Sequence, residues 1–404
     1  MKRISLFCRM ICISMTLALV SCEVVDNVAK PSEGEGDTTY VDLEKVAGIL
    51  AAVPLMQTHL DEVHDAVSSS SGNGYDEEYT MRHLFGNPGA GVGDKDVRSG
   101  SEYTDPLWKL IDRHVRSMAA TKASGIDDPD MFLKMLTESD VQIYWPYSEQ
   151  WNGKDMPVIT FDPEDGARTN TGYRIKVEHD GSRHVEKVVV DEATAMEVPV
   201  WVVNRNTDSG YTSLEMLRRE DPAWGEGGGA IIINPSKDRT SQVKSGSGMK
   251  TLVLKEFTMN RNYDSWFAGA SEFFVKIGYL DNFTASTEAE MRLYNPMVTD
   301  FMIVVKRNQV GVPQPFNAIL VTDWSDQVES CAFMITEDDG GTQTEWTSKA
   351  KVFVAGKSYG VEITIPLNIR DDVVWRGQLA SRWFEESKDE AWPFGDVELT
   401  FDIL

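Results

Sequence analysis

The sequence predicts an α+β, β-rich fold in which a helical N-terminal region is followed by antiparallel β domains, including a C-terminal β-sandwich. Between residues 41 and 137, apolar residues such as Leu43, Val46 and Leu50 recur at helical spacing. From about residue 140 the period changes to two, as expected for strands with one buried face. Turn signals such as Asp338-Asp339-Gly340-Gly341 then separate short strand candidates, a pattern typical of a two-sheet sandwich.

The first 21 residues have the order of an export signal. Lys2, Arg3 and Arg9 give a positive start, and residues 11–20 form an apolar run of about ten residues. A helix that spans a membrane needs about 20 residues, so this run is too short to be one. The run leads into Leu19-Val20-Ser21-Cys22, which resembles the lipobox of bacterial lipoproteins.

The lipobox resemblance implies cleavage before Cys22 and acylation of its thiol. The chain would then be exported and lipid-anchored to the outer membrane, with its body on the periplasmic or cell-surface face. Residues 1–21 are thus a predicted lipoprotein signal peptide, and the polar residues 22–40 a predicted flexible tether. The alternative is an ordinary secretory signal in which Cys22 is incidental.

Charge and cysteine content limit the partners and the means of stabilisation. The formal net charge is -25, and loss of the three positive residues of the signal takes it to -28. A field of this sign repels phosphate, which excludes nucleic acid as a natural partner. Cleavage also removes Cys8 and Cys12, and acylation occupies Cys22, so Cys331 is the one remaining thiol. We therefore expect no disulfide and a fold stabilised by burial.

The body divides into three predicted parts: a helical region at 41–137, a β-rich middle domain at 138–249, and a β-sandwich at 250–404. Asp105-Pro106 and Asp128-Pro129 each place a carboxylate cap before a proline at the first helical position. The strand candidates of the middle and last parts are 141–145, 173–177, 185–190, 198–203, 230–233, 251–259, 272–277, 301–306, 318–322, 331–336, 350–354, 360–365, 373–379 and 397–403.

Three segments resemble signatures of uncharacterised lipoproteins from gut Bacteroidota. They are Gly74-Tyr75-Asp76-Glu77-Glu78-Tyr79-Thr80-Met81, Ile143-Tyr144-Trp145-Pro146-Tyr147-Ser148-Glu149-Gln150-Trp151 and Trp266-Phe267-Ala268-Gly269-Ala270-Ser271-Glu272-Phe273. The resemblance spans most of the chain and implies export, but it implies no activity. The C-terminal part also resembles C2-like domains in its strand count and its acidic loops.

The acidic loops are the candidate metal-binding positions. Calcium takes six to eight oxygen ligands, which carboxylates on neighbouring loops of a sandwich can supply. No EF-hand spacing fixes which oxygens converge, so the alternative is a set of solvated loops. The calcium candidates are Asp264, Glu272, Asp323, Asp326, Asp371 and Asp372.

The aromatic residues near the C-terminal end form the second candidate site. Trp383 and Trp392 flank an acidic stretch at 385–390 and are predicted to lie on a loop. Exposed rings can stack on the faces of sugars or contact a protein partner. We therefore name these two residues as candidate contacts for a glycan or an envelope protein.

No catalytic motif survives inspection of the sequence, and we assign no catalytic residue. We expect a membrane-anchored envelope lipoprotein that acts as a non-enzymatic binding or scaffold protein. The alternative is a hydrolase, for example one directed at glycans, whose carboxylates come together only in three dimensions, such as Glu272 with Asp323.

Overall fold

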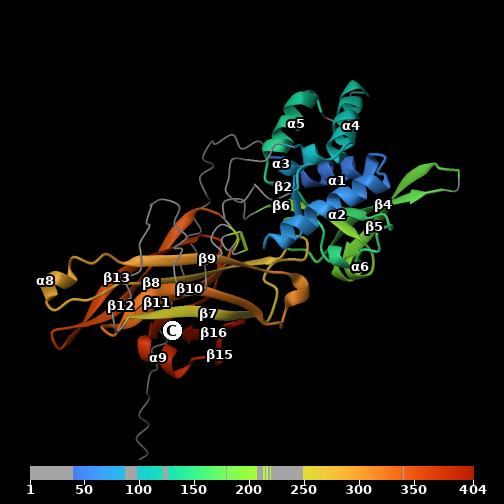
Figure 1. Ribbon diagram of the computed structural model, residues 1–404. Helices are drawn as coiled ribbons and strands as arrows, with labels where there is room; N and C mark the ends of the chain where they lie inside the picture. The colour runs from blue at the N-terminus through green and yellow to red at the C-terminus, as the bar shows by residue number, and fades with distance from the viewer. Residues whose placement is uncertain are drawn as a thin grey trace, which may run out of the picture. The chain divides into compact units, whose positions relative to one another are not determined.

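The long helices and strands form where the apolar periodicity predicts them, whereas the strands at 78–80, 158–161 and 391–394 lie outside the predicted ranges (Figure 1). The computed structural model describes residues 40–86, 98–121, 126–178, 180–206, 249–339 and 341–404, together with 213, 215, 216 and 219. The predicted signal peptide, Cys22, the tether as far as residue 39, and the strand candidate 230–233 lie outside the described residues.

The described residues of the predicted helical region form five α-helices, and the four that are ten residues or longer lie at the predicted stripes and caps. At the start of α5 the Asp128 side chain accepts a hydrogen bond from the Met131 amide at 3.0 Å, with Pro129 in the first turn. The first amide of α4, that of Leu107, donates instead to Glu62 on another helix, at 2.7 Å. The helices are α1 (Leu43–Ala52), α2 (Gln57–Gly72), α3 (Met81–Leu84), α4 (Leu107–Thr121) and α5 (Pro129–Glu138).

The helices pack on one face of a six-stranded sheet with the order β1-β2-β6-β3-β4-β5 (Figure 1). All its pairings are antiparallel except that of β3 with β6. The helical region itself supplies β1, so the predicted parts 41–137 and 138–249 share one sheet and one core. The strands are β1 (Glu78–Thr80), β2 (Val141–Tyr144), β3 (Val158–Phe161), β4 (Thr169–Val177), β5 (Arg183–Asp191) and β6 (Val200–Arg205), and α6 (Glu192–Glu197) links the last two.

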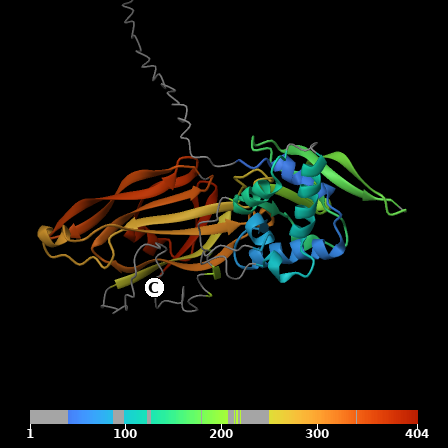
Figure 2. The same ribbon diagram turned by 90° about the horizontal axis from the view of Figure 1, so that it is seen from above.

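The C-terminal part is a β-sandwich, as predicted. One sheet has the order β10-β7-β16-β15, and the other has the order β13-β12-β11-β8-β9 with β14 also paired to β11. Figure 2 shows the yellow to red strands of this part from above. Buried rings such as Phe257, Phe273, Phe333 and Phe401 fill the space between them. The strands are β7 (Met249–Met259), β8 (Ser271–Tyr279), β9 (Met297–Val305), β10 (Gln314–Ser325), β11 (Val328–Glu337), β12 (Gln343–Val354), β13 (Lys357–Asn368), β14 (Asp372–Ala380), β15 (Ala391–Phe394) and β16 (Val397–Ile403).

The β12–β13 hairpin folds back over the outer face of this second sheet. Ala332 and Met334 of β11 form a separate buried cluster there with Ile363 and Ile365 of β13. Gly278 of β8 makes the approach possible, because a Cβ at this position would lie 2.4 Å from Ile363 Cγ2. The hairpin is therefore packed on the sheet rather than free in solvent.

Residues 41–404 form one compact unit. Within the described ranges, none of the helices combines the length and the apolar character needed to cross a bilayer.

Candidate cation site

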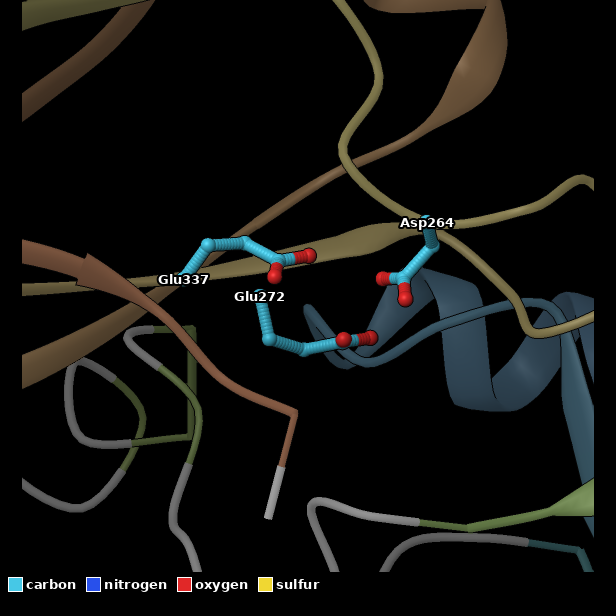
Figure 3. A group of neighbouring side chains, drawn as sticks. All are labelled: Asp264, Glu272 and Glu337. Carbon is cyan, nitrogen blue, oxygen red and sulfur yellow. The ribbon is translucent and has the colours of Figure 1, made fainter. Parts of the chain in front are cut away.

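Three carboxyl groups converge where the β7–β8 loop meets the strand ends at one end of the sandwich. Asp264 lies on that loop, Glu272 is near the start of β8, and Glu337 is the last residue of β11. One ligand atom from each lies within 4.8 Å of the other two. Figure 3 shows the carboxyl groups of Asp264 and Glu337 pointing toward one another, with that of Glu272 beside them.

The three side chains are withdrawn from water. Glu337 is 1% exposed, Glu272 is 7% exposed, and Asp264 is half-buried. Neither carboxylate oxygen of Glu337 accepts a hydrogen bond from an amide, hydroxyl or cationic group of the described chain. Its polar neighbour is the Asp264 carboxyl. A buried acid without donors is costly unless it is protonated or bound to a cation.

Burial sets the protonation behaviour of the pair. It raises the pKa of Glu337 well above the ordinary range, and the adjacent Asp264 carboxylate raises that pKa further. Burial also raises the pKa of Asp264, although a hydrogen bond from Glu337 opposes the rise. Without a cation, the two groups therefore share a proton, because two adjacent buried carboxylates cannot both carry charge at low cost.

The surroundings add negative charge. Asp339 and Asp372 both act to raise the pKa of Glu337, and Asp76 acts in the same sense on Asp264. Arg307 is the cationic group that opposes them at Asp264. Its guanidinium is already paired with Glu192 at 2.7 Å, so it does not neutralise the trio. Among the described charged residues that act on Asp264 and Glu337, carboxylates therefore outnumber cations.

The loop that carries Asp264 is fixed in place from several directions. Arg307 donates to the carbonyl oxygens of Asp264, Ser265 and Gly269 at 3.1 to 3.4 Å. The Ala270 amide donates to Asp76 Oδ2 at 2.9 Å, and a Cβ at Gly269 would lie 2.9 Å from the same oxygen. Gly269 has φ +145°, which also disfavours a side chain there.

The same loop joins the sandwich to the helix-covered sheet. Trp266 and Phe267 pack on the sheet face opposite the helices, against residues such as Tyr144 and Val202. Asn204 of β6 donates to the carbonyl oxygens of Phe267 and Ala268. Asp264 is thus positioned by contacts with both parts of the body, which gives the site a defined geometry.

The arrangement suits a hard divalent cation. All three groups offer carboxylate oxygens, and neither thiolate nor imidazole belongs to the cluster. Calcium–oxygen bonds are about 2.3 to 2.6 Å long, so oxygens on opposite sides of the ion are roughly 4.6 to 5.2 Å apart. The three groups are close enough to contact one calcium ion. Three carboxylates would supply three to six of its oxygens, about half or more of a full shell.

The structure brings together two of the six acidic residues named from the sequence, Asp264 and Glu272. Asp372 borders them, because it is paired in register with Glu337. Asp371 accepts from the Asn368 amide and interacts with Asp338, a neighbour of the trio in sequence.

Asp323 and Asp326 lie elsewhere. Asp326 pairs with Lys250 at 2.8 Å. The Asp323 carbonyl accepts a hydrogen bond from the Asn282 amide. Asn282 follows the C-terminal end of β8, whereas Glu272 lies at its N-terminal end. At about 3.3 Å per strand residue, Glu272 and Asp323 are therefore roughly 20 Å apart. A carboxylate pair that acts on one glycosidic bond is about 5 to 10 Å apart, so these two do not form one.

Sequence reasoning missed Glu337, although β11 carries a signal for it. Cys331, Phe333 and Ile335 alternate on the buried face of this strand, and Glu337 continues the same phase. An acidic residue in a core phase needs a partner, which is the feature that would have identified it.

The two C-terminal tryptophans, Trp383 and Trp392, differ in their burial. Trp383, on the short helix α9 (Ser381–Glu386), packs against the sandwich core, whereas Trp392 on β15 is 38% exposed. Their rings are 5.8 Å apart in an edge-to-face arrangement. Trp392 is therefore the more exposed of the two.

A scan against protein-family models finds no match, and comparisons with curated proteins and with solved structures find none either. The resemblances to Bacteroidota lipoproteins and to C2-like domains therefore stay predictions.

Proposed function

We propose that this chain is an exported, lipid-anchored lipoprotein of the cell envelope, a non-enzymatic binding or scaffold protein whose body binds calcium at Asp264, Glu272 and Glu337. The buried Glu337 carboxyl, which lacks donors and faces Asp264, is the observation that carries the cation assignment. A divalent cation would replace the shared proton and offset the repulsion between the carboxylates.

The binding role is supported by what surrounds the site. The trio is enclosed and held by contacts to both parts of the body, so an ion there would bridge the β7–β8 loop and the sandwich. This is the arrangement expected of an ion that stabilises a binding scaffold. A glycan or an envelope protein is the partner class that we propose for the scaffold.

Calcium titration of the purified full chain in detergent tests the cation site. We expect saturable binding of one ion by calorimetry, with affinity lowered at least about tenfold in Glu337→Gln, which removes a ligand charge. Glu345→Gln is the matched control, because Glu345 is exposed on β12 and outside the cluster. Equal calcium affinity in Glu337→Gln and wild type, or no binding to wild type, would contradict the assignment.

The anchor is tested by fractionation and by labelling with a fatty acid. Cys22→Ala is expected to release the protein from the membrane fraction and to abolish labelling, since Cys22 is the proposed acylation site. Cys331→Ala is the control, because this thiol is buried in the sandwich core. A membrane-bound, labelled Cys22→Ala variant would rule out acylation at this position.

A further inference from the structure

A hollow lies in the helix-covered sheet region, and none of the carboxylate trio lines it. It has a volume of ≈ 210 Å³ and is bordered by the aromatic residues Trp145, Tyr147 and Trp151 and by the polar residues Gln150, Asp155 and Glu197. Sites for drug-sized ligands have volumes of about 300 to 1,000 Å³, so this one suits a single-ring ligand.

The aromatic side of the hollow is rigidly built. Trp145 and Trp151 meet edge to face with ring centroids 5.2 Å apart, and Trp151 donates from Nε1 to the Asp155 carbonyl at 3.0 Å. Tyr147 has φ 60°, a left-handed conformation that is uncommon for a residue with a bulky side chain. Strained residues of this kind cluster at ligand sites, where the surrounding structure holds them.

Contacts behind the hollow keep Tyr147 in that conformation. Its hydroxyl donates to Glu192 Oε1 at 3.1 Å, and the same oxygen accepts from Arg307 at 2.7 Å. Glu192 is thereby neutralised and unavailable to a ligand. The Tyr147 ring position is fixed before any ligand arrives, which lowers the entropy lost on binding.

The polar groups restrict the ligand class. The lining residues include no lysine, arginine or histidine, so phosphates and carboxylates find no counter-charge there. Asp155 Oδ2 accepts from Asn152 Nδ2 at 2.8 Å, which leaves Asp155 Oδ1 and the Glu197 carboxylate as acceptors at the hollow. The Gln150 amide can both donate and accept, as a hydroxyl group requires.

These features match the two kinds of surface on a sugar ring. A pyranose presents an apolar C–H face that can pack on the half-buried Trp151 ring, which the buried Trp145 supports, and a rim of hydroxyl groups that donate to carboxylates and exchange hydrogen bonds with amides. We propose that this hollow binds one neutral sugar residue, free or at the end of a glycan. The proposal rests on the binding role inferred above but does not depend on the cation.

Binding of methyl glycosides to the full chain in detergent, at saturating calcium, tests the proposal. The probes are the methyl pyranosides of glucose, galactose, mannose and N-acetylglucosamine, measured by saturation-transfer NMR and calorimetry. We expect at least one to bind saturably, with Trp151→Ala weakening its affinity at least tenfold. Glu197→Gln, an exposed position whose change leaves the core intact, should weaken it several-fold.

The control variant is Phe353→Ala, which removes an exposed ring on β12 and should leave sugar affinity unchanged. Loss of binding in Trp392→Ala with retention in Trp151→Ala would overturn the proposal, as would no binding of any of the four glycosides at tens of millimolar. Tetramethylammonium binding without sugar binding would also overturn it and would assign an ammonium cage. Calcium binding and acylation are measured on the same samples, so failure of the sugar site is distinguishable from failure of the proposed function.

Discussion

Glu62 shows how one buried side chain links two helices. It is 1% exposed on α2, and its carboxylate accepts from the Leu107 amide at 2.7 Å and from the Tyr79 hydroxyl at 3.1 Å. The bond to Leu107 satisfies an amide that α4 leaves free at its N-terminus, a role that the sequence assigned to Asp105. Burial nevertheless raises the pKa of Glu62 to about 7, from an ordinary value of 4.5.

This pKa shift predicts a loss of stability as the pH rises. Between pH 4.5 and about 7 the folded chain keeps a proton that the unfolded chain has released, so Glu62 lowers the free energy of unfolding across that window. The difference amounts to at most about 3 kcal/mol. Urea denaturation at several pH values should show Glu62→Gln gaining stability relative to wild type as the pH rises.

Glu138→Gln is the control for that measurement, because Glu138 is exposed at the end of α5. Its stability should follow the wild-type pH profile. An identical pH dependence in wild type and Glu62→Gln would show that Glu62 does not titrate in this window.

At the candidate site, residue type and position in a loop were enough to predict some members. Asp264 and Glu272 were named from the sequence because acidic groups near turns of a sandwich can reach one another. Glu337 was not, because it ends a strand that reads as apolar core. Which loops meet depends on strand order, and residue patterns do not encode strand order directly.

At the scale of elements, long periodic strands and the four-residue β2 were predicted well, whereas the short strands β1, β3 and β15 were missed. Every strand candidate beyond residue 250 corresponds to an observed strand. β3 was missed because three of its four residues are apolar, so it shows no alternation. β15 contains Pro393 and the exposed Trp392, which read as loop, yet proline is tolerated there because β15 is at the edge of its sheet.

Packing of the β12–β13 hairpin on β8 predicts a large effect of one methyl group. Gly278→Ala places a Cβ 2.4 Å from Ile363 Cγ2, so the hairpin must shift. We expect a loss of about 1 to 3 kcal/mol in the free energy of unfolding, measured by urea denaturation. Gly360→Ala is the matched change within the hairpin, because its Cβ would meet Lys349 Cδ at an ordinary 3.5 Å. Equal stability of the two variants would show that the hairpin does not need this close approach.

At the scale of the whole molecule, the observed parts of the body differ from the parts that the sequence periodicity predicts. The change from helical to strand period near residue 140 suggested two parts, but β1 completes the sheet formed by β2 to β6 and the helices cover one of its faces. Periodicity reports local structure and which face is buried, not which element covers that face. The sequence pattern therefore could not predict that this sheet contains one parallel pair, β3 with β6.

Cys331 supplies a reporter for unfolding of the whole sandwich. It is fully buried between the sheets, and burial raises the pKa of its thiol to about 12. A thiol reagent should therefore label the acylated protein only after the sandwich opens. Calcium should slow labelling in wild type because it binds the folded state, and should have little effect in Glu337→Gln.

The labelling experiment uses Glu345→Gln as the control, in which calcium should protect the thiol as in wild type. Rapid stoichiometric labelling under native conditions would show that the sandwich opens locally around β11. Equal protection by calcium in Glu337→Gln and in wild type would show that the ion does not bind at the trio.

The place of β16 has a consequence for biogenesis. This strand lies between β7 and β15, and its Val397 is paired with Met259, far back along the chain. Before β16 has left the ribosome or the translocation channel, one edge of β7 is unpaired and part of the apolar core is not yet covered by β16. Such an intermediate is prone to aggregate, so we expect the nascent protein to require a holding chaperone until residue 403 has emerged.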